Sequence, residues 1–589
     1  MQVWDEQLET HTNKRVKIKR SGHPTMANIT GKKTIFFVTS PRTPDKMIDE
    51  IDLLVLNFSG KKWDKKTQQA FANLLRESEF FQGKLAENDD FGARDRINRS
   101  PKALGFVDLN PISLTPAGEQ YVYGKRPSEA LTRQLLKFQL PSPFHVDKGD
   151  TFYVKPYLEL MRMVYELNGL SKDEIQAFFM EMVSYDLFDE IKNRILKFRK
   201  DVRSRGKQIS YKTLLDQAMN NRVLEIYDNE IKANKLKTRE SKDTSLTKFL
   251  RTKKQNHRDY ADAAIRYLRA TELFELEPRT YRLVVAKGKK KDVEYILNTV
   301  DRKPYPYKDE NDYKEYLYNP NLPKLLTDNK DELISKIIIL DQSKKHTKQS
   351  LSLKDIGELK DIHSDLVQTI KAQNIEAIKN ELASYSIFED VQQVFEDIKH
   401  NNVVDAPLYF EWNTWRAITM ITSGNIIGNF RVDTEGNPLQ TAPGNKPDIY
   451  CDYTDFDVIV EVTLSTGHKQ YEMEGEPITR HLAAQKRLNQ EKGLKKESYC
   501  LFIAQKVSEA TLAYIYSMHR INISYYGGTS KIIPIDLSDF QLLLNKLRNR
   551  DRKANVESLK IILEEACKKA LTTENELQWQ KEIKSLFTT

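Results

Sequence analysis

The sequence predicts an α+β protein built from several domains. Its 589 residues suggest roughly three or four domains of about 150 residues each. Helical periodicity alternates with short β-branched runs along most of the chain, and the 39% hydrophobic content can supply packed cores. With only 22 Gly and 21 Pro, the composition excludes a disordered, collagen-like or low-complexity polymer.

The sequence has no feature typical of a membrane or secreted protein, and this indicates its cellular compartment. No apolar run approaches the roughly 20 residues of a membrane-spanning helix, and the polar N-terminus has no secretory core. The cysteines Cys451, Cys500 and Cys567 form no Cys-x-x-Cys pair, which argues against a zinc module or a disulfide scaffold. We therefore expect a cytoplasmic protein with no membrane partner.

Charge divides the chain into two unlike parts. Residues 1–300 carry 55 Lys and Arg against 41 Asp and Glu, whereas residues 301–589 carry 38 against 43. A basic first half suggests a polyanionic partner, and an acidic second half suits carboxylates that hold a cation. Uneven solvation of the surface is the alternative explanation.

The first structural unit is predicted over residues 33–145, after an extension at 1–25 that we expect to be disordered. Residues 34–39 (TIFFVT) favour a strand. Residues 91–109 favour a basic helix that ends near Gly105, and a strand and a helix capped by Thr115 follow. This order is typical of a winged-helix unit. The cations crowding the first helix favour DNA contact over a generic helix and hairpin: Arg94, Arg96, Arg99 and Lys102.

A second winged-helix-like unit is predicted over residues 146–285. Ser171 and Glu174 match a capping box, and residues 259–285 repeat the order of a helix followed by a hairpin. The stretch 232–258 before that hairpin is strongly basic, and Lys253, Lys254 and Arg258 lie at its end. We interpret the two units as a composite DNA-recognition surface, with a solvated basic face as the alternative.

Residues 286–400 are predicted to be a hinge and a helical linker. The first part is charged, rich in tyrosine and interrupted by prolines, whereas residues 331–400 are strongly helical.

The region from 401 to 589 alternates strands and helices, and it carries the clearest chemical pattern. Asp448 lies in Gly444–Ile449 (GNKPDI), and Glu461 follows 13 residues later on the apolar, β-branched run 457–463. Such a run predicts a buried central strand. Carboxylates on adjoining strands can share Mg²⁺, which polarises a phosphate and activates water.

This spacing is that of the PD-(D/E)xK nuclease fold, except that Thr463 occupies the lysine position. Glu411, on the preceding helix, is a candidate third carboxylate. In the following segment Glu474 is a candidate metal or water ligand. His481 is either a structural histidine or a functional one that acts as a proton shuttle or a phosphate contact. Arg480 could hold a phosphate, and Lys469 or Lys486 could replace the missing lysine. We thus predict an α/β nuclease domain of PD-(D/E)xK type over residues 401–589.

The chain resembles the AlwI-like family of type IIS restriction endonucleases, which includes PleI, MlyI and the BstNBI-type nicking endonucleases. The matching stretches, in order, are FFVTSPRTPDK, ARDRINRSPKALGFV with LTPAGE, DYADAAIRYLRATELF, FEWNTW, GNKPDI, EVTLSTG, EGEPITRH and YCLFIA.

The resemblance implies a bacterial enzyme that reads a short asymmetric site in double-stranded DNA and cuts a few base pairs away with Mg²⁺. It implies a catalytic set of Glu411, Asp448, Glu461, Glu474 and His481, of which Glu411, Asp448 and Glu461 would hold the metal. Expected partners are a cognate DNA methyltransferase and, for double-strand cleavage, a second catalytic copy or a small subunit.

Two other function classes stay open. One is a DNA-binding regulator or accessory subunit with a degenerate nuclease domain, which would bind no metal. The other is a structure-specific repair nuclease, which would show no sequence preference.

Overall fold

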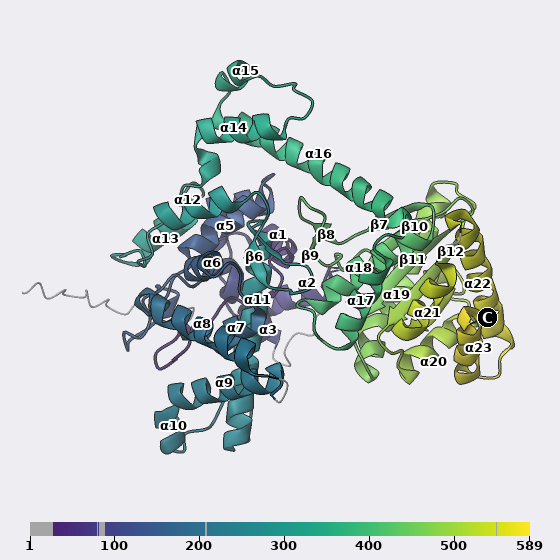
Figure 1. Ribbon diagram of the computed structural model, residues 1–589, viewed down its shortest axis with the longest axis horizontal. Coiled ribbons are helices and arrows are strands. Elements are labelled where there is room, and N and C mark those ends of the chain that lie inside the picture. The colour runs from purple at the N-terminus through teal and green to yellow at the C-terminus, as the bar shows by residue number, and fades with distance from the viewer. Residues whose placement is uncertain (1–26, 79, 82–88, 207–208, 549–550, 589) are drawn as a thin grey trace, which may run out of the picture.

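The computed structural model describes residues 27–78, 80–81, 89–206, 209–548 and 551–588. The predicted extension at 1–25 lies outside the described residues. Figure 1 shows two bodies side by side, with a helical arm above them. We call residues 27–329 the N-terminal body, residues 330–383 the arm and residues 388–588 the C-terminal body.

The first part of the N-terminal body contains the predicted order of helix, hairpin and helix. Its elements are α1 (Lys46–Phe58), α2 (Lys65–Glu77), α3 (Asp89–Ile97), a π-helical turn (Asn98–Lys102), β2 (Val107–Leu109), β3 (Ile112–Leu114), α4 (Pro116–Val122) and α5 (Pro127–Lys137). Strands β2 and β3 pair antiparallel. The predicted cap is confirmed, since the Thr115 side chain accepts a hydrogen bond from the Gly118 N–H at 3.0 Å.

The predicted strand over residues 34–39 is wrong. These residues pair with no strand, and the Ile35 N–H instead donates to the Met180 carbonyl oxygen at 2.9 Å. Ile35, Phe37 and Val38 are nevertheless buried, and the Phe36 ring lies 6.4 Å from the ring of Tyr260. The apolar, β-branched pattern therefore predicted the burial of this segment correctly but not its structure, because the segment packs between helices and does not pair with a strand.

The second part of the N-terminal body is mostly helical. Its elements are β4 (His145–Val146), which pairs with β1 (Ala27–Asn28), then α6 (Pro156–Glu166), α7 (Lys172–Ala177), α8 (Phe188–Ser204), α9 (Tyr211–Ile226), α10 (Asp228–Lys232), α11 (Leu246–Ala270), β5 (Phe274–Leu276) and β6 (Leu283–Val285). The capping box of Ser171 and Glu174 is confirmed at the start of α7. Helix α11 leads into the β5–β6 hairpin, which matches the predicted repeat of helix and hairpin.

The proline-rich start of the linker packs against the N-terminal body. Helices α12 (Lys290–Thr299) and α13 (Glu310–Tyr318) form there, and the buried Lys137 donates to the carbonyl oxygens of Leu317 (2.6 Å) and Asn319 (2.8 Å). This segment is thereby fixed to α5.

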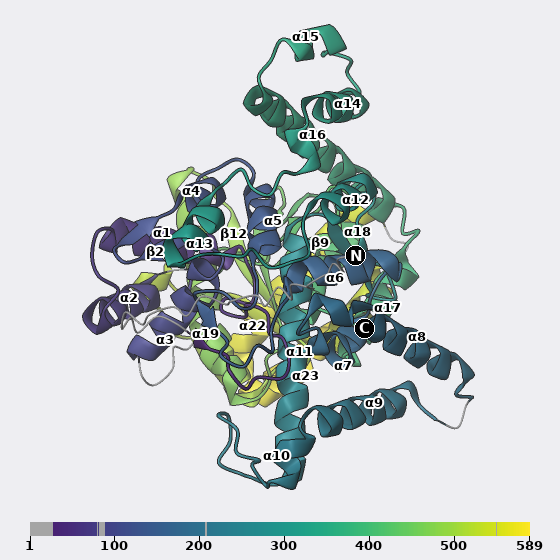
Figure 2. The same ribbon diagram turned by 90° about the vertical axis from the view of Figure 1, so that its left-hand side faces the viewer.

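The arm consists of α14 (Lys330–Leu340), α15 (Lys348–Ser352) and α16 (Ile356–Ala383). It has a small hydrophobic core of its own, formed by Leu333, Ile334, Ile337, Leu351 and Leu359. Figures 1 and 2 show α15 standing clear of both bodies at the tip of the arm, with α16 descending to the C-terminal body. The arm also contacts the N-terminal body, because Lys336 of α14 pairs with Asp292 of α12 (2.5 Å) and Lys360 of α16 pairs with Glu129 of α5 (2.5 Å).

The C-terminal body surrounds a five-stranded mixed sheet of order β13-β12-β11-β10-β7. Its elements are α17 (Phe388–Lys399), α18 (Ala406–Ile421), β7 (Asn425–Gly428), β8 (Arg431–Val432), β9 (Pro438–Gln440), β10 (Ile449–Asp452), β11 (Phe456–Thr463), α19 (His468–Glu491), β12 (Glu497–Ala504), α20 (Glu509–Met518), β13 (Ile532–Asp536), α21 (Leu537–Leu547), α22 (Arg552–Thr572) and α23 (Glu576–Thr588). Strand β11 is central, as its sequence predicted, and it pairs antiparallel with β10 and parallel with β12. Among the described residues, no helix is both long and apolar enough to span a membrane.

Candidate active site

A β-hairpin brings Asp448 and Glu461 together. Asp448 immediately precedes β10, and Glu461 lies on β11, where Ile449 pairs with Val460. Asp448 Oδ2 accepts a hydrogen bond from the Val462 N–H at 2.8 Å, so this carboxyl group reaches across the hairpin. Burial of the carboxyl group, followed by the charge on Glu461, raises the pKa of Asp448 well above its usual value.

Glu411 approaches the same place from α18. The residue is buried, and its Oε2 accepts a hydrogen bond from the Ala442 N–H at 2.8 Å. Burial, followed by the charge on Asp448, raises the pKa of Glu411 well above its usual value. The structure therefore brings this predicted third carboxyl group into electrostatic contact with the hairpin.

Glu474 is hydrogen-bonded to Thr463, the residue that occupies the lysine position of the motif. Thr463, two residues after Glu461 on β11, donates its hydroxyl hydrogen to Glu474 Oε1 at 2.6 Å. Burial of Glu461, followed by the charge on Glu474, raises the pKa of Glu461 well above its usual value. Thr463 thus serves as an anchor for a fourth carboxyl group. Lys486, one proposed substitute for the missing lysine, instead donates to the Thr529 carbonyl oxygen at 2.7 Å.

His481 has a hydrogen-bond partner at each of its two ring nitrogens. Its Nδ1 lies 2.7 Å from Glu461 Oε1, and its Nε2 lies 3.2 Å from the Gly444 carbonyl oxygen. Burial, with the nearby charge of Arg480, lowers the pKa of His481 to about 4, whereas burial raises the pKa of Glu461. Both contacts are satisfied when a protonated Glu461 donates to Nδ1 and Nε2–H donates to Gly444. His481 therefore fixes the position of the Glu461 carboxyl group.

Glu411, Asp448, Glu461 and Glu474 form what we call the carboxyl cluster. In the described part of the chain, no three His, Cys, Asp or Glu side chains converge closely enough to hold a metal ion as they stand. The donor chemistry nevertheless fits a hard divalent cation, because crowded, buried oxygen ligands raise one another's pKa values and a cation would relieve that repulsion. Binding would require these side chains to move closer together.

A groove of about 300 Å³ opens beside the carboxyl cluster. It is lined on one side by Asn445 and Pro447, which precede Asp448, and on the other by His481, Gln485 and Arg487 of α19. This groove gives a solvent-borne substrate access to His481.

The cations predicted to contact DNA near α3 have unlike surroundings. Arg94 is exposed, whereas Arg96 forms an ion pair with the buried Glu50, and Arg99 Nε lies 2.6 Å from Asp95 Oδ1. Lys102 is 5% exposed, and its Nζ lies 4.6 Å from the centre of the Phe144 ring. Lys102 therefore does not belong to an accessible surface, and we leave it out of the proposed DNA contact.

The cations predicted on α11 lie nearer the surface. Lys253 Nζ is 4.3 Å from the centre of the Tyr227 ring, and Lys254 Nζ is 2.7 Å from Asp216 Oδ1. Arg258 is exposed.

Lys32, which the sequence did not single out, and Arg239, from the basic stretch 232–258, join Arg99 and Lys253. We call these four residues the cationic cradle. Lys32 Nζ lies 4.3 Å from the centre of the Phe36 ring, on the segment that inserts against α11. Partial burial, followed by the charges of the other three, lowers the pKa of Lys32 to about 8. No local pattern could have found this group, because its members lie far apart in the sequence.

A comparison with protein-family models identifies the family of this chain. A family model described as AlwI restriction endonuclease matches residues 102–543, which is more than half of the chain. Among solved structures, the chain is 27% identical to the small subunit (R.BspD6I2) of the heterodimeric restriction endonuclease R.BspD6I. That match covers 33% of this chain and 98% of the subunit, with a TM-score of 0.29. No curated protein matches the sequence.

Proposed function

The chain belongs to the AlwI restriction endonuclease family and is therefore a site-specific nuclease, and we propose that it is a Mg²⁺-dependent type IIS member. In this proposal the N-terminal body reads a short asymmetric site in duplex DNA. The C-terminal body hydrolyses a phosphodiester bond a few base pairs away.

The observation that carries the proposal is the carboxyl cluster. Buried carboxyl groups that raise one another's pKa values destabilise a fold unless a cation or a proton compensates them. Their position on adjacent strands and on the two flanking helices supports a role in metal-assisted hydrolysis.

In the proposed reaction, Asp448, Glu461 and Glu411 would hold Mg²⁺, and the bound ion would neutralise charge at the scissile phosphate and lower the pKa of a water. His481 would keep the Glu461 carboxyl group oriented through their hydrogen bond. Glu474, held by Thr463, orients the attacking water. The water oxygen bonds to phosphorus as the P–O3′ bond breaks. The attacking water gives up a proton to solvent and the departing O3′ takes up a proton from solvent, which leaves a 5′-phosphate and a 3′-hydroxyl.

The N-terminal body supports the binding half of the proposal. The cationic cradle draws Arg99 from the first helix–hairpin unit and Lys253 from the second, so a single phosphate backbone could contact both units at once. Two unlike units also suit an asymmetric site, since neither requires two-fold symmetry in the DNA.

The number of active sites needed to cut both DNA strands determines which partner the enzyme requires. One active site cuts one strand, so a double-strand break requires a second catalytic copy or a small subunit, and without either the enzyme is a nickase. We also expect a cognate methyltransferase that protects the same site.

The test is cleavage of a supercoiled plasmid that carries many sequence contexts, in Mg²⁺ and in EDTA. We expect Mg²⁺-dependent products, either discrete linear fragments or open circles, and Asp448→Ala should abolish them while DNA binding in a gel-shift assay persists. DNA binding without any Mg²⁺-dependent cleavage by the wild type would favour a regulator or accessory subunit. Cleavage without sequence preference would favour a structure-specific repair nuclease.

A further inference from the structure

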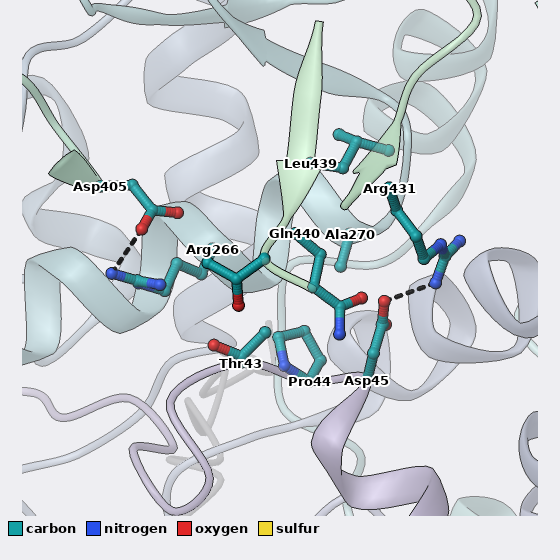
Figure 3. A pocket seen from close by; sticks show the side chains of 10 residues that line it. Thr43, Pro44, Asp45, Arg266, Ala270, Asp405, Arg431, Leu439 and Gln440 are labelled. Carbon is teal, nitrogen blue, oxygen red and sulfur yellow. Dashed lines mark hydrogen bonds and ion pairs between the residues drawn. The ribbon is translucent and has the colours of Figure 1, made fainter. Parts of the chain in front are cut away.

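A buried ion-pair triad joins the two bodies. Asp405, immediately before α18, adopts a left-handed backbone conformation (φ 60°), and its side chain is 3% exposed. Arg269 Nη1 donates to Asp405 Oδ2 at 3.1 Å, and Arg266 Nη2 lies 2.7 Å from Oδ1. Both arginines belong to α11 of the N-terminal body, and Figure 3 shows Arg266 paired with Asp405. A non-glycine residue keeps a left-handed backbone conformation only where surrounding contacts hold it, so the contacts around Asp405 fix its position before α18.

The β8–β9 hairpin of the C-terminal body adds polar contacts around this triad. Arg431 forms an ion pair with Asp45, just before α1 (Figure 3). Arg269 also donates to the Pro438 carbonyl oxygen. The space enclosed between the two bodies here is about 10 Å³. That volume holds about one water at most, so the polar contact is closely packed.

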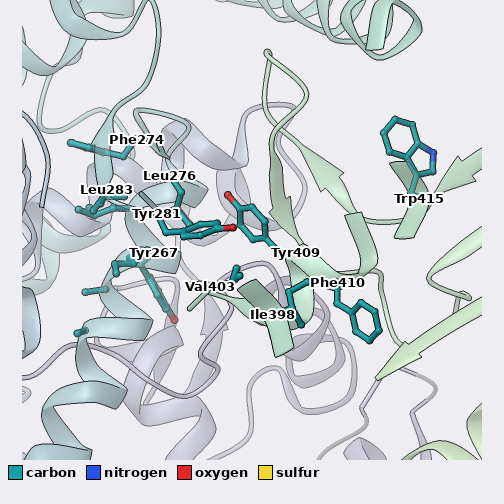
Figure 4. Packing of buried hydrophobic residues seen from close by; sticks show 14 of the residues in the cluster. Tyr267, Phe274, Leu276, Tyr281, Leu283, Ile398, Val403, Tyr409, Phe410 and Trp415 are labelled. Atoms are coloured by element: carbon teal, nitrogen blue, oxygen red, sulfur yellow. The ribbon is translucent and has the colours of Figure 1, made fainter. Parts of the chain in front are cut away.

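An apolar contact continues beside the triad. The rings of Tyr281, next to β6, and Tyr409, on α18, meet edge to face with their centres 5.3 Å apart (Figure 4). Leu276 and Leu283 of the N-terminal body and Val403 of the C-terminal body belong to the same continuous hydrophobic cluster. An interface that shares one core and a buried triad is unlike the small, polar contacts that allow domains to move.

Helix α11 links this interface to the proposed DNA contact. Its N-terminal part carries Lys253 and Arg258, and its C-terminal turns carry Arg266 and Arg269. Asp405, which these arginines hold, directly precedes α18, and α18 carries Glu411. A rigid path therefore runs from the proposed DNA contact to the carboxyl cluster without passing through the arm.

We propose that the interface centred on Asp405, Arg266 and Arg269 sets the distance between the recognised site and the cut phosphodiester bond. This inference rests on the proposed type IIS function. The helical linker connects the two bodies covalently, but its length does not measure the offset, because the bodies are already fixed to each other. Asp405 is thus a positioning residue. The interface that it holds together, and not the helical linker, acts as the spacer between the recognised site and the cut.

The first experiment maps cut positions to the nucleotide for three proteins. The wild type should cut at one offset. A four-residue Gly-Ser insertion between Lys344 and Lys345, exposed at the tip of the arm, should leave that offset unchanged. Asp405→Asn should spread the cuts over two or more positions while the recognised sequence stays the same.

A matched control is Asp452→Asn, which removes an ion pair to Lys496 (2.6 Å) that lies within the C-terminal body. This variant should keep the single offset, because it leaves the interface intact. A shifted offset in the insertion variant, or a single unchanged offset in Asp405→Asn, would overturn the proposal. If the wild type does not cut DNA, the proposed function is refuted. The fixed interface is then tested by the second experiment alone.

The second experiment measures the distance between the bodies directly and does not require cleavage. Spin labels are placed at Leu56 of α1 and Leu571 of α22, both exposed, in a Cys567→Ser background. Pulsed electron paramagnetic resonance should give one narrow distance distribution for the parent protein, with and without duplex DNA, and a broader one for Asp405→Asn. A distribution that is broad in the parent, or that shifts when DNA binds, would contradict a fixed interface.

Discussion

The carboxyl cluster and the cationic cradle both gather like charges, but they do so at different depths. The carboxyl groups are enclosed between a hairpin and two helices, and burial is the largest cause of each raised pKa. Lys32 of the cradle is an exposed residue, and its pKa falls only to about 8. The difference matches the ligands that we propose. A small cation can enter an enclosed site, whereas an extended polyanion requires an open one.

The largest expected effect is the loss of catalysis in Asp448→Asn. Removing one of the proposed metal ligands should reduce cleavage by about 10³-fold or more, while DNA affinity stays unchanged. The measurement is the rate of plasmid cleavage beside a gel-shift titration. Asp455→Asn, at an exposed aspartate on the same hairpin, is the control and should cleave normally.

The same variant should be more stable than the wild type in EDTA. The folded-state pKa of Asp448 is raised, so its ionisation opposes folding, and stability is lost as the pH rises above the unfolded pKa of about 4. Asparagine removes that loss, so its melting temperature at pH 8 should exceed that of the metal-free wild type. An unchanged or lower melting temperature would show that the ionised Asp448 carboxylate does not destabilise the metal-free fold.

The next effect tests the cradle. The double variant Arg99→Gln, Lys253→Gln should weaken DNA binding on the order of tenfold or more, and the slope of log K against log salt should fall by about two. Lys102→Gln provides the contrast, because Lys102 is buried against Phe144. It should lower the melting temperature and leave the salt slope unchanged. Equal salt slopes for the double variant and the wild type would remove Arg99 and Lys253 from the DNA contact.

A smaller effect concerns Thr463. Thr463→Val removes the 2.6 Å hydrogen bond to Glu474, and we expect roughly a tenfold lower cleavage rate because the carboxyl group loses its anchor. Thr463→Ser keeps the hydroxyl group and should stay close to the wild-type rate. Single-turnover kinetics would measure both, and two equal rates would show that the hydrogen bond does not position Glu474.

The smallest effect is a pH dependence of DNA affinity. The pKa of Lys32 is about 8 in the free protein, and a phosphate contact would raise it, so affinity should fall as the pH increases from 7 to 9. Solvent screens part of this shift because the residue is exposed, so we expect a decrease of a few-fold. Lys32→Arg stays charged and should lose the dependence in fluorescence anisotropy titrations, whereas an identical dependence in both proteins would implicate another group.

Local sequence predicted the parts of the fold that short-range chemistry controls. The central strand at 457–463, the cap at Thr115 and the capping box of Ser171 and Glu174 are all confirmed. The strand at 34–39 was wrong, because apolar alternation indicates burial and does not specify a partner strand. For the same reason, a basic residue such as Lys102 could not be assigned to the surface from its sequence alone.

The sequence by itself determined the carboxyl pair and the AlwI family. Asp448 and Glu461 lie on one hairpin, so their spacing along the chain fixes their spacing in space, and a family pattern is linear by nature. Only the tertiary structure joined Lys32 and Arg239 to Arg99 and Lys253, and only it placed Asp405 between Arg266 and Arg269. Lys32 lies 67 positions before Arg99, and Arg266 lies 139 positions before Asp405. Which of these residues meet depends on how whole helices pack.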